Sequence, residues 1–257
     1  MPIVRQEASL IDQLAPFPRN DRVRVWDLPL RLFHWILVVA IATAFLSAEE
    51  DSPLSQWHIL SGWIAGVLIA FRLVWGVVGG EHSRFASFIR PAAVGHHMRN
   101  LVRGRTEPSV GHNPLGGLSA VLLLLLVAAA VFTGATMGLI WDGEIHEMIG
   151  WSLLALVLVH VAAVICMSIL SGENLIQAMI VGTKHSARHP GVRDARAPGI
   201  FAILLGLLAI AGSAVAIRVY DPQAFTLRST ESFEHRTEGG GHSARVEERS
   251  ASRDEDD

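Results

Sequence analysis

Five long apolar stretches constrain the fold of this chain more than any other feature. They cover roughly residues 30–47, 57–78, 115–140, 144–170 and 198–217. A helix needs about 20 residues, at 1.5 Å each, to cross the hydrocarbon core of a bilayer, and these stretches are of that order or longer. In lipid only helices and closed barrels satisfy their own backbone hydrogen bonds, and the sequence lacks the short alternating strands of a barrel. We therefore predict an all-α integral membrane protein.

The basic residues indicate which way the helices cross the membrane. Fourteen Lys and Arg residues fall in three segments, which are the tail up to Arg31, residues 79–114 and residues 171–197. The two intervening connections, 48–56 and 141–145, have none and carry acidic residues instead. Because Lys and Arg accumulate in cytoplasmic loops, the N-terminus is expected in the cytoplasm and the two acidic connections on the outer side.

The two ends of the chain follow from this orientation. Residues 1–21 have no apolar core of a signal peptide, and we expect them to form a cytoplasmic tail. A fifth crossing puts the C-terminus outside, so residues 218–257, which are polar and end in DEDD, are expected to be a disordered periplasmic tail. Between the tails lie an expected four-helix unit, residues 22–185, and the fifth helix, residues 198–217.

Four of the twelve histidines lie inside the apolar stretches: His34, His58, His146 and His160. His146 and His160 are 14 residues apart on the fourth stretch, so both leave the same helix face at levels about 21 Å apart. The alternating direction of the spans brings His58 level with His146 near the outer side. By the same argument His34 is level with His160, nearer the inner side. The sequence therefore predicts two sites, each built from histidines of two different helices.

The chemistry of these sites depends on how many ligands are available. A lone intramembrane histidine can simply hydrogen-bond across helices, whereas ionisable residues at matched depths indicate a functional site. A structural zinc ion needs four ligands, often thiolates, and the only cysteine of the chain is Cys166. Haem iron needs only two axial histidines, because the porphyrin supplies four nitrogens. With no CxxCH motif for covalent attachment, we predict two haems b with axial pairs His34/His160 and His58/His146.

Arg72 is the only Lys or Arg well inside a span. It lies 14 residues after His58, on the same helix face and near the predicted inner level. A buried arginine is costly in a membrane unless it is paired, and a haem propionate is a suitable bidentate partner. The alternative is that Arg72 extends along the helix to the inner interface.

Small residues also recur at helical spacing. Gly62 and Gly66 form one pair separated by three residues, and Gly134 and Gly138 form another. This pattern is typical of close helix–helix packing and needs no cofactor.

Several motifs resemble one known family. They are WDLPLRLFHW, a second span that begins with a histidine and ends FRLVWGVVGGEHSRFASF, then GHNPLGG, and a fourth span with His-x13-His. Together they resemble the bacterial cytochrome b561 / Ni,Fe-hydrogenase b-type cytochrome subunit family over about residues 22–185. The resemblance implies a four-helix membrane bundle with two b-type haems on the same four histidines, exchanging electrons with quinone. The fifth span and the outer tail depart from the family pattern.

The function expected from these features is that of a dihaem b-type cytochrome in the bacterial inner membrane. It would transfer electrons across the membrane between the quinone pool and a redox protein such as a cytochrome c or a dehydrogenase subunit. Lipid and quinone are the other expected partners, and nothing indicates nucleic acid. Three alternatives stay open: a stand-alone superoxide:quinone oxidoreductase, a haem-containing anchor of a redox complex, and a zinc-binding or transport protein. No catalytic residue is assigned, so whether the chain is itself an enzyme also stays open.

Overall fold

The computed structural model describes residues 22–49, 54–88, 111, 114–140, 143–186 and 191–227. Within these ranges five helices are long and apolar enough to cross a membrane. They are α2 (Leu28–Leu46), α3 (Ser55–Val78), α6 (Pro114–Ala135), α7 (Gly143–Ser171) and α9 (Ile200–Tyr220). The predicted all-α membrane fold is thus confirmed, while the predicted tail at 1–21 and residues 228–257 of the predicted outer tail lie outside the described residues.

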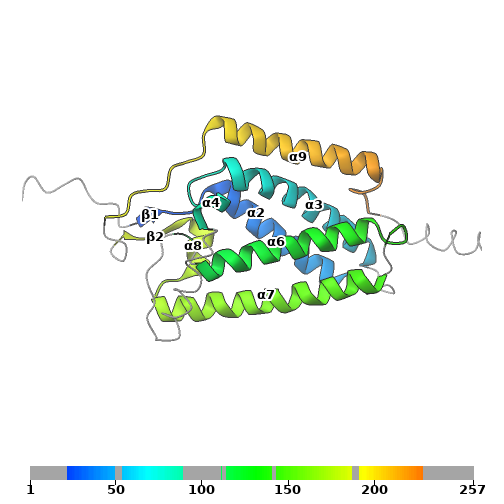
Figure 1. Ribbon diagram of the computed structural model, residues 1–257, viewed down its shortest axis with the longest axis horizontal. Helices are drawn as coiled ribbons and strands as arrows, with labels where there is room; N and C mark the ends of the chain where they lie inside the picture. Colours follow the sequence, from blue (N-terminus) through cyan, green and yellow to red (C-terminus); the bar gives the residue numbers. More distant parts are fainter. Residues whose placement is uncertain are drawn as a thin grey trace, which may run out of the picture.

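Helix α3 lies at the centre of the bundle. It packs against α2, α6 and α9, and α9 and α7 lie on opposite sides of the other three long helices (Figure 1). Helix α7 packs on α6 and on the short helix α8 (Leu175–Val181). Among the described residues, α7 makes no comparably close backbone contact with α2 or α3. The backbone of α7 therefore lies further from the α2–α3 pair than from α6.

Local sequence signals explain where these helices begin and end. Asp27 caps α2 by accepting a hydrogen bond from the N–H of Leu30 at 2.9 Å, and proline occupies the first turn. Helix α6 ends at Ala135, several residues before the end of the apolar stretch predicted at 115–140. The chain turns at Gly138, whose φ of 78° lies in the left-handed region that favours glycine.

A two-stranded ribbon closes one end of the bundle, which we call the strand end. Strand β1 (Arg22–Arg24) pairs antiparallel with β2 (Thr183–His185), so the start of α2 is joined to the chain that follows α8. The N–H groups of Val25 and Trp26 both donate to the carbonyl of Gly182, at 2.9 and 3.1 Å. The opposite end of the bundle, where α2 leads towards α3 and α6 leads towards α7, we call the open end.

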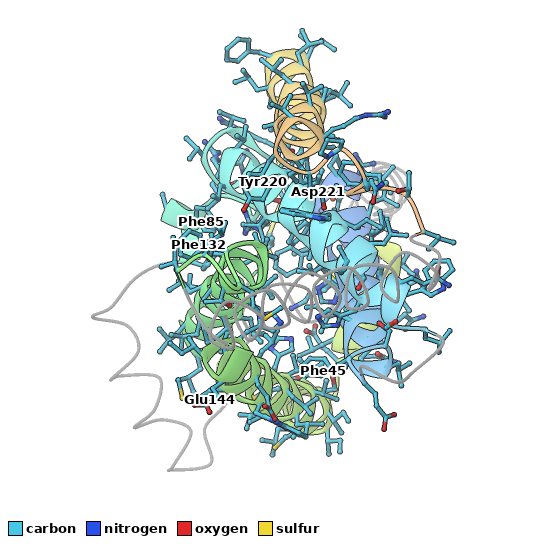
Figure 2. All side chains as sticks on the ribbon, turned by 90° about the vertical axis from the view of Figure 1, so that its right-hand side faces the viewer. Phe45, Phe85, Phe132, Glu144, Tyr220 and Asp221 are labelled. Atoms are coloured by element: carbon cyan, nitrogen blue, oxygen red, sulfur yellow. The ribbon has the colours of Figure 1, made fainter. Side chains whose placement is uncertain are left out.

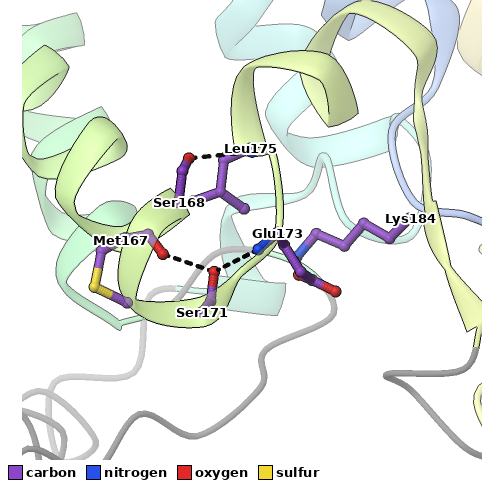
Figure 3. A network of polar contacts seen from close by, with 6 residues as sticks. All are labelled: Met167, Ser168, Ser171, Glu173, Leu175 and Lys184. Carbon is purple, nitrogen blue, oxygen red and sulfur yellow. Dashed lines mark hydrogen bonds and ion pairs between the residues drawn. The ribbon is translucent and has the colours of Figure 1, made fainter.

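A buried ion pair supports the turn from α7 to α8 at the strand end (Figure 3). Lys184 Nζ lies 3.4 Å from Glu173 Oε2, and both side chains are largely buried. Burial lowers the pKa of the Lys184 amine, and the Glu173 carboxylate opposes that shift. In the same turn the Ser171 hydroxyl donates to the carbonyl of Met167 and accepts from the N–H of Glu173.

The chain between β2 and α9 is fastened to the end of α3. Glu81 accepts hydrogen bonds from Arg193 Nη2 at 3.2 Å and from the N–H of Arg196 at 3.0 Å. The hydrogen bond from Arg196 and the nearby arginine charges hold the pKa of the Glu81 carboxyl below its ordinary value. Helix α9 then packs along α3, where Gly206 lies directly against the rings of Phe71 and Trp75.

We predict that Gly76 is essential for packing at the strand end. A Cβ atom at this position would overlap the ring of Phe85, which follows on α4 (Phe85–Phe88). Gly76→Ala should therefore destabilise the bundle, by about 1–3 kcal/mol as expected for overpacking. Gly212→Ala on α9 is the matched control, since its Cβ would have no neighbour within 4 Å. Thermal unfolding in one detergent would measure both, and equal midpoints for the two variants would contradict the prediction.

Candidate functional site

The structure brings His58 and His146 together at the open end. His58 lies in the first turn of α3 and His146 in the first turn of α7. Their ring centroids are 5.9 Å apart and the ring planes are nearly perpendicular, at 84°. We call this the outer pair, following the predicted orientation.

The other ring nitrogen of each outer histidine is held by the protein. His58 Nδ1 lies 2.8 Å from the carbonyl oxygen of Ala44, which can only accept, so the proton is on Nδ1. His146 Nδ1 lies 3.1 Å from the hydroxyl of Thr133, and that hydroxyl donates to the carbonyl of Ala129 at 2.9 Å. The Thr133 oxygen therefore accepts from His146 Nδ1–H, and the backbone of Ala130 is a second partner of the His146 ring. In both rings Nε2 keeps its lone pair, as a metal-binding imidazole requires.

His34 and His160 form the second level, which we call the inner pair. They lie on α2 and α7, and His160 is an electrostatic neighbour of His34. His160 Nδ1 is 3.2 Å from the hydroxyl of Ser119 on α6. The ring of His34 makes an edge-on contact with Trp35, with centroids 5.2 Å apart. On α7, a hydroxyl from α6 thus faces Nδ1 of the histidine at each level.

An apolar layer separates the two levels. Leu153 is seven residues from both His146 and His160, so it lies on the same face of α7 midway between them. It is 5% exposed and packs with buried Ala65 and Ile69 of α3 and Val127 of α6. Packed apolar side chains therefore lie between the outer and inner pairs.

Arg72 is buried rather than extended to the surface. Its side chain lies over the Phe85 ring, with the guanidinium carbon 4.5 Å from the ring centroid, and the residue is 3% exposed. Asp27 is an electrostatic neighbour, but its oxygens accept hydrogen bonds from the Leu30 N–H, Trp75 Nε1 and the Ser83 hydroxyl. Arg72 Nη1 has no hydrogen-bond partner in the part of the chain that the structure describes. A buried cation with a free donor suits an anionic ligand group.

The donor sets do not resemble a structural zinc site. Across the described residues, no three His, Cys, Asp or Glu side chains gather as a metal ion held only by protein would need. Cys166 is exposed on α7. Each histidine level supplies two imidazoles, which is the number that haem iron takes from a protein when both axial positions are filled.

Comparison with known proteins identifies the family. The prokaryotic cytochrome b561 family matches residues 25–182, which include all four histidines. The chain belongs to the prokaryotic cytochrome b561 family. It is therefore a multi-pass membrane cytochrome of the electron-transfer class, and the family implies b-type haem.

Individual relatives are similar along most of their own length. A probable Ni/Fe-hydrogenase B-type cytochrome subunit of Bradyrhizobium diazoefficiens is 25% identical over 211 residues, which cover 63% of this chain and 85% of that protein. A probable subunit of the same name from Azotobacter vinelandii is 26% identical over 216 residues, 64% of this chain and 89% of that protein. No solved structure matches the chain. Helix α9 lies beyond the family match.

The outer pair of this cytochrome fits a haem iron. Imidazole nitrogens bind first-row metal ions such as zinc at about 2.0–2.1 Å, so two rings on opposite sides of one ion have centroids separated by roughly 6 Å. The observed separation is 5.9 Å. Gly62 and Gly150, each four residues after an outer histidine, face open space, because a Cβ at either would meet no atom within 4 Å. The two histidine helices are therefore uncrowded at these glycines, one turn from the outer histidines.

The predicted role of the glycines in helix packing holds only in part, and two hydroxyls of the site were not predicted. The close-packing interpretation holds for Gly66, whose Cβ would contact Val131 and Ile217, but Gly62 faces open space and Gly138 forms a turn. Gly134 lies against the His146 ring, since a Cβ at this glycine would be 3.0 Å from Cε1 of the histidine. Sequence reasoning missed Thr133 and Ser119, because a hydroxyl on one apolar helix gives no signal of a histidine partner on another.

Proposed function

We propose that this cytochrome holds two haems b and conducts electrons across the bacterial inner membrane between quinone and a redox protein. The outer haem would be ligated by His58 and His146, and the inner haem by His34 and His160. When bound, haem iron supplies a one-electron ferric/ferrous couple. The observation that carries the proposal is the 5.9 Å outer pair, in which both Nδ1 atoms are engaged and both Nε2 atoms are free to ligate.

The spacing of the two pairs suits a relay. Along α7 the ligands differ in level by about 21 Å, which is more than half of the roughly 30 Å hydrocarbon core. Leu153 and its neighbours keep water out of the layer between the pairs. An apolar surrounding strengthens the hydrogen bonds that hold the imidazoles. In this proposal residues 22–185 form the haem-binding unit, and residues 198–217 add a fifth helix to it.

The orientation proposed for the bundle has the strand end in the cytoplasm. Exposed arginines gather there, including Arg22, Arg24 and Arg193, whereas exposed Glu49 and Glu144 lie at the open end. This distribution follows the positive-inside rule. The N-terminus would be cytoplasmic, the C-terminus periplasmic, and the outer pair would lie near the periplasmic surface.

The redox protein proposed as the partner is a hydrogenase or a dehydrogenase of similar kind. The relatives in Bradyrhizobium and Azotobacter are named as probable B-type cytochrome subunits of Ni/Fe hydrogenase, which supports a redox partner of that kind. Quinone is the proposed redox substrate in the membrane, as the family resemblance implies. Purification of the native complex would identify the partner.

We predict that the ligand pairs respond to mutation as pairs. His58→Ala and His146→Ala should each remove the same haem, leaving one component with the same midpoint potential. His34→Ala and His160→Ala should both leave the other component. Potentiometric titration, monitored by optical absorption, would measure the midpoint potential of the haem that each variant retains. If His58→Ala and His34→Ala left the same component, the proposed pairing would be wrong.

Arg72 is proposed to bind a propionate of the inner haem. The buried guanidinium with its free Nη1 supports this role. Its positive charge would offset the propionate and favour the ferrous state, so Arg72→Gln should lower the inner midpoint potential. A loss of about 1.4 kcal/mol corresponds to about 60 mV for a one-electron couple. Arg72→Lys should shift the potential less, because it keeps the charge without the bidentate geometry.

The outer haem is the internal control for Arg72, since its ligand level is about 21 Å away along the helix. Its potential should stay nearly constant in both variants. An unchanged inner potential in Arg72→Gln, with both haems retained, would leave Arg72 as a packing residue stacked on Phe85.

A further inference from the structure

The last turn of α9 is fastened to two other helices at the open end. Trp63 Nε1 on α3 donates to Asp221 Oδ2 at 3.1 Å, and the Trp63 ring makes an edge-on contact with Tyr220, with centroids 5.9 Å apart. The Tyr220 hydroxyl donates to the carbonyl of Ala135 on α6 at 2.8 Å. We call Trp63, Tyr220, Asp221 and the Ala135 carbonyl the α9 latch. Figure 2 views the bundle from this end, with Tyr220 and Asp221 where α9 meets α3.

Apolar packing supports the latch one turn further into the bundle. A Cβ at Gly66 on α3 would lie 3.2 Å from Val131 of α6 and 3.7 Å from Ile217 of α9. Three helices therefore meet at this glycine. The end of α9 is held by polar groups at the surface and by close packing beneath them.

The same turn of α6 that receives Tyr220 also holds His146. Thr133 accepts from His146 Nδ1, a Cβ at Gly134 would lie 3.0 Å from His146 Cε1, and Ala135 is the next residue. Helix α6 ends at Ala135, so its carbonyl is among those that lack a helical N–H partner. Tyr220 supplies that missing donor. The last turn of α6 thus contacts α9 on one side and the outer histidine on the other.

We propose that Tyr220, fixed by Trp63 and Asp221, is a positioning residue for the outer haem ligand His146. This inference rests on the proposed haem ligation. It makes α9, which lies beyond the family match, part of the outer site. An interfacial tyrosine that only anchored a helix in the lipid headgroups would have no such connection to His146.

The direction of the effect follows from the His146–Thr133 hydrogen bond. An acceptor on Nδ1–H makes the imidazole a stronger donor to the metal, which favours the ferric state. Loosening the last turn of α6 weakens this bond and favours the ferrous state. Loss of the Tyr220 hydroxyl should therefore raise the midpoint potential of the outer haem.

The test is potentiometric titration of both haems in the full-length protein in one detergent. Tyr220→Phe, which keeps the ring and removes the hydroxyl, should raise the outer potential and leave the inner one unchanged. Thr133→Val should shift the outer potential further in the same direction, and Tyr220→Phe should add little to it in that background. Ser213→Ala is the matched control, because among the described residues this α9 hydroxyl donates within its own helix, to Ala209 and Ile210, and its loss should shift neither potential.

Each result decides the inference. An unchanged outer potential in Tyr220→Phe with both haems retained, or equal shifts of both haems, would overturn it. Should Tyr220→Phe fail to accumulate, Trp63→Phe removes the donor to Asp221 and should give the same upward shift, and no shift there would overturn the inference. A wild-type protein without haem would instead refute the proposed function itself, which keeps the two failures distinct.

Discussion

Each histidine of the site has two ring nitrogens to satisfy inside an apolar helix bundle, and this requirement organises the bundle. An unpaired polar group in hydrocarbon costs several kcal/mol. In the outer pair the protein satisfies Nδ1 through the carbonyl of Ala44 and the hydroxyl of Thr133. Both Nε2 atoms then keep their lone pairs, and the two rings stand at a spacing that suits one metal ion between them. The iron of the proposed haem would satisfy Nε2, the second nitrogen of each ring.

The helix arrangement follows from the same requirement. Helix α7 carries one histidine of each pair, and its close contacts are with α6 and α8 rather than with the helices that carry the other two histidines. Helix α6 therefore acts as the support of α7, through Ser119 at one level and Thr133 at the other. Leu153 of α7 is buried against residues of α3 and α6, and it lies between the two histidine levels. Helix α9 also contacts the end of α6, through the hydrogen bond from the Tyr220 hydroxyl to the carbonyl of Ala135.

Sequence reasoning predicted the parts of this arrangement that depend on period and length. Five spans, their alternating direction and the common face of His146 and His160 all follow from helix geometry applied to one chain. The contact between His58 and His146 agrees with the level predicted for them, although ligation itself stays a prediction. The contacts between helices did not follow, because the position of Thr133 or Tyr220 along its own helix contains no information about the neighbouring helix. The end of α6 was also placed too late, since the helix ends at Ala135 and the chain turns at Gly138 while the apolar composition continues.

The central claim is that each chain holds two noncovalent haems at two separate levels. The most direct measurement is a pyridine haemochrome assay on the purified wild-type protein, with the haem content divided by the protein concentration, joined to a potentiometric titration of the same sample. The account predicts two extractable haems b per chain that titrate as two one-electron components. A single haem per chain, or haem that stays bound to the protein after acid-acetone extraction, would contradict it.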